Sequence, residues 1–236
     1  MKNVYTAAVD GFKLTLRRLD LLIIVFIFDG MSYAFSYLSS AIDKNIFVGF
    51  LSLCLTLISL SYSISIPYFL SKQKSSYTEL KSVVLKNAKR LIKPMLIIMA
   101  VFGVGALASV SMLSANEMSG NEIITLWTNI FSNMNSVFHP SAVILRIFAA
   151  MFTFTSIYFS IKNMSFFASM QYSFSFSYRH MAIVVTLFTY LTLVTALNSI
   201  WGKWVPLQIV ASIVQIGVGY YITTLTYSYF IASSKH

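Results

Sequence analysis

Four long runs of this sequence contain no Asp, Glu, Lys or Arg. They are residues 45–71, 95–116, 181–202 and 204–234. About 20 apolar residues are enough for a helix to cross a bilayer. Only 10% of the 236 residues are charged, whereas a soluble domain averages about 25%. The sequence therefore predicts an all-α polytopic membrane protein, and it excludes a soluble globular enzyme, a coiled coil and a disulfide scaffold.

Hydropathy and proline positions together predict six transmembrane helices in a single membrane domain, residues 1–236. Pro94, Pro140 and Pro206 lie at or next to the predicted starts of three of them, where a helix tolerates proline best. Gly217 and Gly219 are expected to allow close helix packing. The six spans are 21–42, 46–70, 94–115, 141–162, 181–200 and 206–231.

The basic residues predict the orientation. Of the 17 Lys and Arg residues, all but Lys44, Arg146 and Lys203 fall on one side of the predicted spans. Connections rich in Lys and Arg stay in the cytoplasm. We therefore expect a multi-pass protein of the inner (plasma) membrane with both termini in the cytoplasm.

Each pair of spans follows a cytoplasmic interfacial segment: 1–20, 72–93 and 165–180. The first two have the pattern of amphipathic interfacial helices. In the third, aromatic and serine residues alternate, which suggests a strand. An isolated strand at a bilayer surface would leave its backbone groups unpaired, so a helix is favoured there. Residues 116–140 are expected to form an amphipathic loop on the outer side.

This layout, three repeats of a surface helix followed by two spans, resembles a group of bacterial six-span proteins. The stretches Gly11-Phe12-Lys13 and Lys86-Asn87-Ala88-Lys89 add to it. The group comprises the YciC-like proteins and the membrane domains found beside glycerophosphodiester phosphodiesterases. The layout is also similar to the permease of an exporter with a separate ATPase. The resemblance implies an architecture and carries no defined activity.

Catalytic chemistry has no recognisable basis in the sequence. Cys54 is the single cysteine, and the three histidines are far apart. The sequence has no H-E-x-x-H, C-x-x-C, G-x-S-x-G or P-loop motif. We therefore expect a protein that is not an enzyme, with no catalytic residues, no bound metal and no cofactor.

Asp29 is the one acidic residue expected deep inside a span, about 12 Å beyond Leu21. An acid at such a depth costs about 2.5–3.5 kcal/mol on insertion scales. It begins one of three polar helix faces that could line a substrate or ion path, although Ser, Thr and Gln also serve to join helices. The residues of this hypothetical path are Asp29, Tyr33, Ser36, Ser59, Ser63, Gln208, Ser212 and Gln215.

The segment 72–93 carries seven cations. Its basic face, Lys81, Lys86, Lys89 and Arg90, could contact anionic lipids, bind a partner protein, or serve only as a topology signal. Nucleic acid is the least favoured partner because no nucleic-acid-binding motif accompanies the charge.

The leading hypothesis is a non-enzymatic membrane subunit of a transport or secretion assembly. Its partners would be the lipid bilayer and other protein subunits, with a cytoplasmic ATPase as one candidate. The first alternative is a self-contained channel or transporter that uses Asp29 and a polar helix face. The second is a lipid-binding or membrane-organising protein.

Overall fold

The computed structural model describes residues 2–41, 46–72, 76–114, 140–201 and 205–234, and their regular structure is entirely helical. This confirms the all-α prediction. The outer loop predicted at 116–140 lies outside the described residues except for Pro140. The helices are α1 (Lys2–Arg17), α2 (Leu19–Ala41), α3 (Ile46–Leu70), α4 (Tyr77–Ser114), α6 (Pro140–Phe152), α7 (Thr155–Ser160), α8 (Phe166–Arg179), α9 (Met181–Trp201) and α10 (Val205–Ser233).

One stretch within the described residues, Ala142–Ser160, is long and apolar enough by itself to cross a membrane. Phe166–Arg179 and Met181–Leu197 meet the same criterion only together, as a pair bent by 104°. The structure therefore supports one or two spans by length and composition. The count of six stays a prediction from the sequence.

The predicted boundary at Pro94 is wrong as a helix start, because α4 continues through this proline as one helix of 38 residues. Leu91 lies before Pro94 and is buried against Ile64 of α3 and Phe159 of α7. Met95 packs on the same cluster from the other side of the proline. Contacts on both sides of Pro94 explain why the helix is not interrupted there.

The segment 165–180 and the end of the fourth predicted span, 141–162, are linked by hydrogen bonds. Residues 166–179 form α8, which confirms the choice of a helix over a strand. The fourth span is broken after Phe152, since α6 ends there and α7 begins at Thr155. Ser173 and Ser177 of α8 both donate to the carbonyl oxygen of Met151, at 2.9 and 2.7 Å. The last carbonyls of a helix have no intrahelical donor, so α8 supplies donors at the end of α6.

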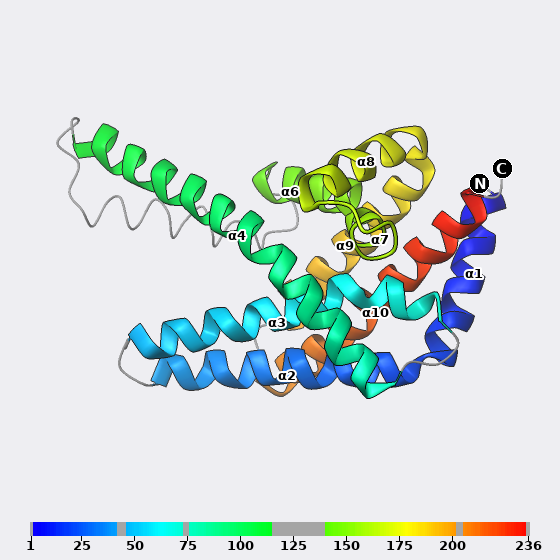
Figure 1. The fold of residues 1–236 in the computed structure, drawn as a ribbon, viewed down its shortest axis with the longest axis horizontal. Helices are drawn as coiled ribbons and strands as arrows, with labels where there is room; N and C mark the ends of the chain where they lie inside the picture. Colours follow the sequence, from blue (N-terminus) through cyan, green and yellow to red (C-terminus); the bar gives the residue numbers. More distant parts are fainter. Residues whose placement is uncertain (1, 42–45, 73–75, 115–139, 202–204, 235–236) are drawn as a thin grey trace.

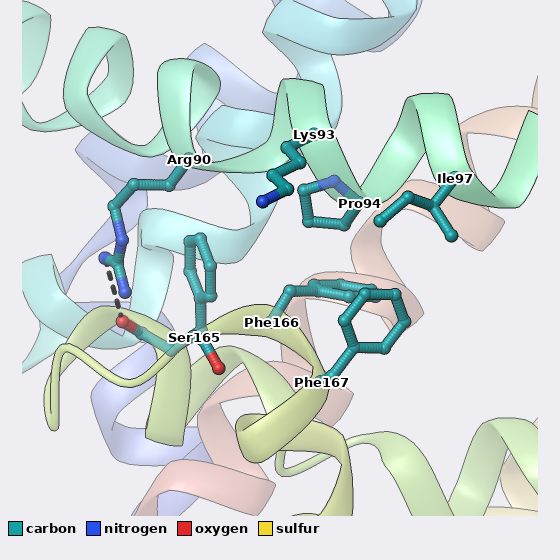
Figure 2. A pocket seen from close by; sticks show the side chains of 8 residues that line it. Arg90, Lys93, Pro94, Ile97, Ser165, Phe166 and Phe167 are labelled. Carbon is teal, nitrogen blue, oxygen red and sulfur yellow. Dashed lines mark hydrogen bonds between the residues drawn. The ribbon is translucent and has the colours of Figure 1, made fainter.

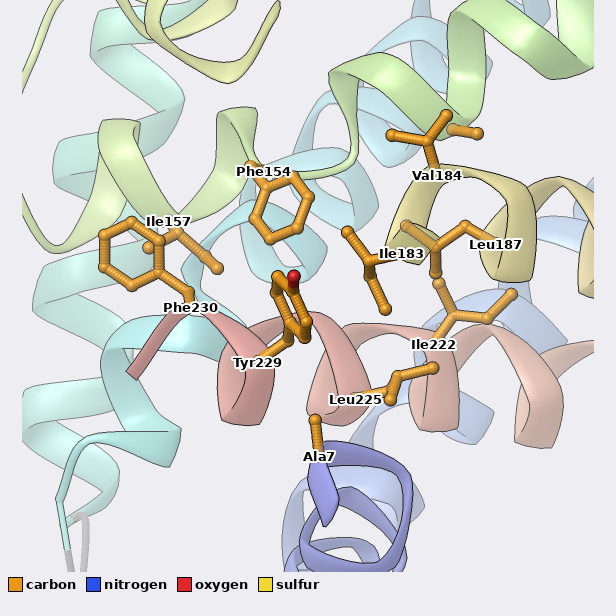
Figure 3. Close-up of a cluster of buried hydrophobic side chains, with 11 residues drawn as sticks. Ala7, Phe154, Ile157, Ile183, Val184, Leu187, Ile222, Leu225, Tyr229 and Phe230 are labelled. Carbon is orange, nitrogen blue, oxygen red and sulfur yellow. The ribbon is translucent and has the colours of Figure 1, made fainter. Parts of the chain in front are cut away.

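The core lies where α3, α7 and α10 approach one another, and we call these three the central helices. Each contains a Tyr-Phe pair with a buried phenylalanine: Phe69, Phe159 and Phe230. The largest buried cluster joins α7, α9 and α10, and Ala7 of α1 completes it (Figure 3). This end of the bundle is filled with aromatic and aliphatic side chains.

Three amphipathic segments surround the central helices: α1, residues 77–93 of α4, and α8. We call them the collar helices. α1 runs along the end of α10, although the two are at opposite ends of the chain (Figure 1). Residues 77–93 pack on α3, and α8 packs on α6 and α7. Each collar helix therefore lies on the last helix of the repeat before it, and α1 closes the ring.

The close approach of α1 and α10 depends on Gly11. A Cβ atom at this position would lie 2.8 Å from the Cα atom of Leu225. The expected close packing at Gly217 and Gly219 is wrong, because a Cβ atom at either position meets nothing within 4 Å. Among the glycines whose surroundings the structure describes, the one that brings two helices together is Gly11 in the collar helix α1.

Candidate functional site

Arg18 lies between α1 and α2 and closes the end of α3. It is buried, and its Nη1 donates to the carbonyl oxygens of Phe69 and Lys72, at 2.5 and 2.7 Å. Nε and Nη2 donate to the carboxylate of Asp20 at 3.0 and 3.1 Å. Burial raises the pKa of Asp20, but the hydrogen bond and charge of Arg18 outweigh it, so the net pKa is lowered. A cation at a helix C-terminus also complements the helix dipole.

Arg90 plays the corresponding role at the end of α7. Its Nη1 donates to the carbonyl oxygen of Phe159 at 3.2 Å, and its Nη2 donates to the carbonyl oxygen of Met164. The guanidinium lies 4.0 Å from the centroid of the Phe159 ring. Arg90 thus ties α4 to the turn that follows α7. Asn163 in this turn has a positive φ of 55°, a conformation that Asn tolerates well.

His180 occupies the third such position, between α8 and α9. Its Nδ1 lies 3.1 Å from the hydroxyl oxygen of Tyr229 in α10, and its ring stacks at 4.3 Å on Phe176. Burial and the neighbouring Arg179 lower the pKa of His180. Each collar helix is therefore followed, or ended, by a basic side chain that contacts the central helix of its own repeat.

Sequence reasoning missed these three contacts. A usable signal exists in the repeated Tyr-Phe pairs, Tyr68-Phe69, Tyr158-Phe159 and Tyr229-Phe230, each followed within a few residues by Lys. The pairs mark the ends of the three central helices. The arginines are not at matching distances from these pairs, so the partners cannot be read from spacing.

A pocket of about 440 Å³ lies beside Arg90, between α4 and the start of α8 (Figure 2). Lys93 and Ile97 extend from α4 toward α8, where Phe166 and Phe167 lie, whereas Arg90 points toward the turn before α8. Pro94, Phe159 and Ser165 complete the lining. One part of the pocket is basic and the rest is apolar, so it suits an amphipathic anion better than a small polar solute.

The predicted basic face of residues 72–93 divides into two parts. Lys81, Lys86 and Lys89 are exposed, as an interaction surface requires. Arg90 is different, because its guanidinium is bonded to carbonyl oxygens within the protein. The use of this face for a partner or anionic lipids stays a prediction, and its available cations are the lysines.

At the start of this face, Lys72 and Glu79 form an ion pair beside Tyr68. The hydrogen bond between them raises the pKa of Lys72 and lowers that of Glu79. The Ser76 hydroxyl accepts from the backbone N–H of Glu79 at 3.2 Å, as expected at a helix N-terminus. The pair fixes the connection between α3 and α4.

The hypothetical polar path is described only in part. Asp29, Tyr33, Ser36 and Gln208 lie in helices, but their side chains are outside the described set. Ser59 and Ser63 on α3 and Ser212 on α10 are half-buried, and Gln215 is exposed. Ser59, Ser212 and Gln215 each have an interaction partner. The path therefore stays a prediction.

In the described part of the chain, no three His, Cys, Asp or Glu side chains come together, so no metal site is visible there.

No family model matches the sequence, no curated protein is significantly similar to it, and no solved structure matches its fold. The proposals below therefore depend on the chain's own geometry.

Proposed function

We propose that this chain is a six-span membrane protein, with cytoplasmic termini, that serves as a non-enzymatic subunit of a transport or secretion assembly. The proposal that the chain spans a membrane is supported by the distribution of exposed side chains. Outside the collar, large apolar side chains face outward, among them Val101 (66% exposed) and Phe148 (50%). Exposed charged side chains, as far as the structure describes them, fall within 4–20, 72–93 and 162–179. A soluble protein rarely exposes so much apolar surface.

The proposal that the chain is a subunit is supported by the part of α4 that follows its collar residues, 77–93. Residues 96–101 are all exposed. Successive helical residues point about 100° apart, so this stretch exposes apolar side chains around the helix, and Ile97 also lines the pocket beside α8. An apolar helix of this kind offers a surface to another membrane protein or to lipid. The aromatic filling between the central helices favours a packed subunit over a self-contained channel.

Extraction and labelling test the membrane part. The chain should stay with the membrane fraction after alkaline carbonate treatment, and its release would refute a membrane-spanning protein. In a Cys54→Ala background, Ser119→Cys should react with an impermeant thiol reagent in intact cells, whereas Ser82→Cys should react only after permeabilisation. The reverse pattern would overturn the orientation.

Co-purification after mild detergent extraction tests the subunit part. A partner should be recovered in fixed stoichiometry, and changing Lys81, Lys86 and Lys89 to Gln should weaken its recovery. The matched control changes three exposed cations elsewhere, Lys13, Arg17 and Arg179, to Gln, which removes the same charge. Equal loss in both triple variants would contradict a specific basic face. Solute transport by the lone chain in liposomes would favour a self-contained transporter.

A further inference from the structure

The pocket beside α4 has an accessible cation that the fold itself does not use. The Lys93 side chain is exposed and extends into the pocket (Figure 2). Among the residues that the structure describes, none forms a hydrogen bond or ion pair with it. This differs from Arg90, whose guanidinium joins α4 to α7. Lys93 is therefore available to a ligand.

The surroundings of Lys93 suit a phosphate group. Arg90 provides a second positive charge in the lining of the pocket. The amides of Phe166 and Phe167 are in the first turn of α8, where backbone N–H groups have no intrahelical acceptor. The Ser165 hydroxyl caps the N–H of Ala168 in the same turn. Two cations and the first turn of α8 thus border the same space.

The remaining lining suits a hydrocarbon chain. Ile97, Phe166 and Phe167 form the apolar side of the pocket. This apolar surface continues onto the exposed residues Leu96 and Val101 of α4. A free phosphate would leave this apolar surface uncovered. A phospholipid would cover it while its phosphate remained at the basic end.

We propose that this pocket binds one acidic phospholipid, with its phosphate at Lys93 and an acyl chain against Ile97 and Phe167. The inference rests on the membrane location proposed above, and it assigns the ligand class at one place on the collar. Lys93 would act as the specific contact, whereas Lys81, Lys86 and Lys89 would contribute only general attraction to a negative surface.

The test is thermal unfolding of the purified full chain in a neutral detergent with three added probes: phosphatidylglycerol, phosphatidylcholine and inorganic phosphate. A ligand that binds only the folded state raises the midpoint in a concentration-dependent way. We expect phosphatidylglycerol to raise it and the other two probes to leave it unchanged. Lys93→Gln should weaken the apparent affinity for phosphatidylglycerol about tenfold, the loss expected for one charge-assisted hydrogen bond. Lys93→Arg should retain most of it.

Lys81→Gln is the matched control, because it removes the same charge from an exposed position on the same helix. Equal effects of Lys81→Gln and Lys93→Gln would overturn the pocket in favour of general surface charge. An equal response to inorganic phosphate would overturn the lipid as its ligand. If carbonate treatment leaves the chain in the membrane but phosphatidylglycerol has no effect, only the pocket proposal fails.

Discussion

The Nη1 atom of Arg18 lies 2.5 Å from the carbonyl oxygen of Phe69, at the end of a helix 51 residues further along the chain. The contact is buried, and the same guanidinium reaches Asp20. Arg18 therefore joins the start of α2, the end of α3 and, through its own carbonyl oxygen, the hydroxyl of Tyr220 in α10. Arg18 thus connects three helices, two through its side chain and the third through its backbone carbonyl oxygen.

Arg18→Ala should lower the free energy of unfolding by about 2–4 kcal/mol, because it removes charged hydrogen bonds from one buried and one partly buried carbonyl group. Arg17→Ala is the control, since Arg17 is adjacent but exposed, and it should change stability by no more than about 0.5 kcal/mol. Denaturant unfolding in micelles, followed by circular dichroism, measures both. Equal effects would mean that the Arg18 contacts are dispensable.

Gly11→Ala should destabilise the contact between α1 and α10 by about 1–3 kcal/mol, as overpacking does in other cores. The new Cβ atom would lie 2.8 Å from the backbone of Leu225, which cannot move aside as a flexible side chain can. Gly30→Ala is the matched control, because its Cβ atom would meet nothing within 4 Å. Alanine favours a helix over glycine by about 1 kcal/mol, so the control should be neutral or stabilising. Midpoints of thermal unfolding would show opposite signs.

Ser173→Ala and Ser177→Ala should together cost more than the sum of the two single changes. Either hydroxyl alone can still donate to the Met151 carbonyl oxygen, so each single change should cost about 0.5–1.5 kcal/mol. The double change leaves a partly buried carbonyl group without these donors. Ser175→Ala alters an exposed serine of the same helix and serves as the control. Additive losses in a double-mutant cycle would show that the two hydroxyls act independently.

Stability should fall as the pH is lowered through about 6.5, and His180 should contribute to this fall. Its pKa is lower in the folded protein, so the unfolded chain binds a proton first and the balance shifts toward unfolding. The groups facing the ring are Arg179, Phe176 and the Tyr229 hydroxyl. His180→Gln should reduce the pH dependence of the unfolding midpoint between pH 5 and 8. An unchanged profile would exclude His180 as its source.

The helix at 165–180 was predictable because only a helix satisfies its backbone at an apolar boundary. The alternating Phe and Ser pattern also contains a spacing of four, which places Ser169, Ser173 and Ser177 on one buried face. The continuity of α4 through Pro94 was not predictable. It depends on Ile64 and Phe159, which are far away in the sequence and hold the helix on both sides of the proline.

The candidate site, too, was predictable only where it depends on residues close together in the sequence. The sequence places Lys81, Lys86, Lys89 and Arg90 together as one basic face, because charge and helical spacing are local properties. It does not show that Arg90 meets the carbonyl end of α7, since that contact spans 69 residues. The pocket at Lys93 also needs α8 as its second wall, and α8 comes from another repeat.

The packing of α1 against α10 has a consequence for biosynthesis. Thr15 and Thr224 share a hydrogen bond across 209 residues, so α1 cannot reach its place until α10 has been made. Until then, the face of α1 that includes Ala7 lacks the α10 surface that covers it in the folded chain. The ring of collar helices therefore closes only after chain synthesis reaches α10.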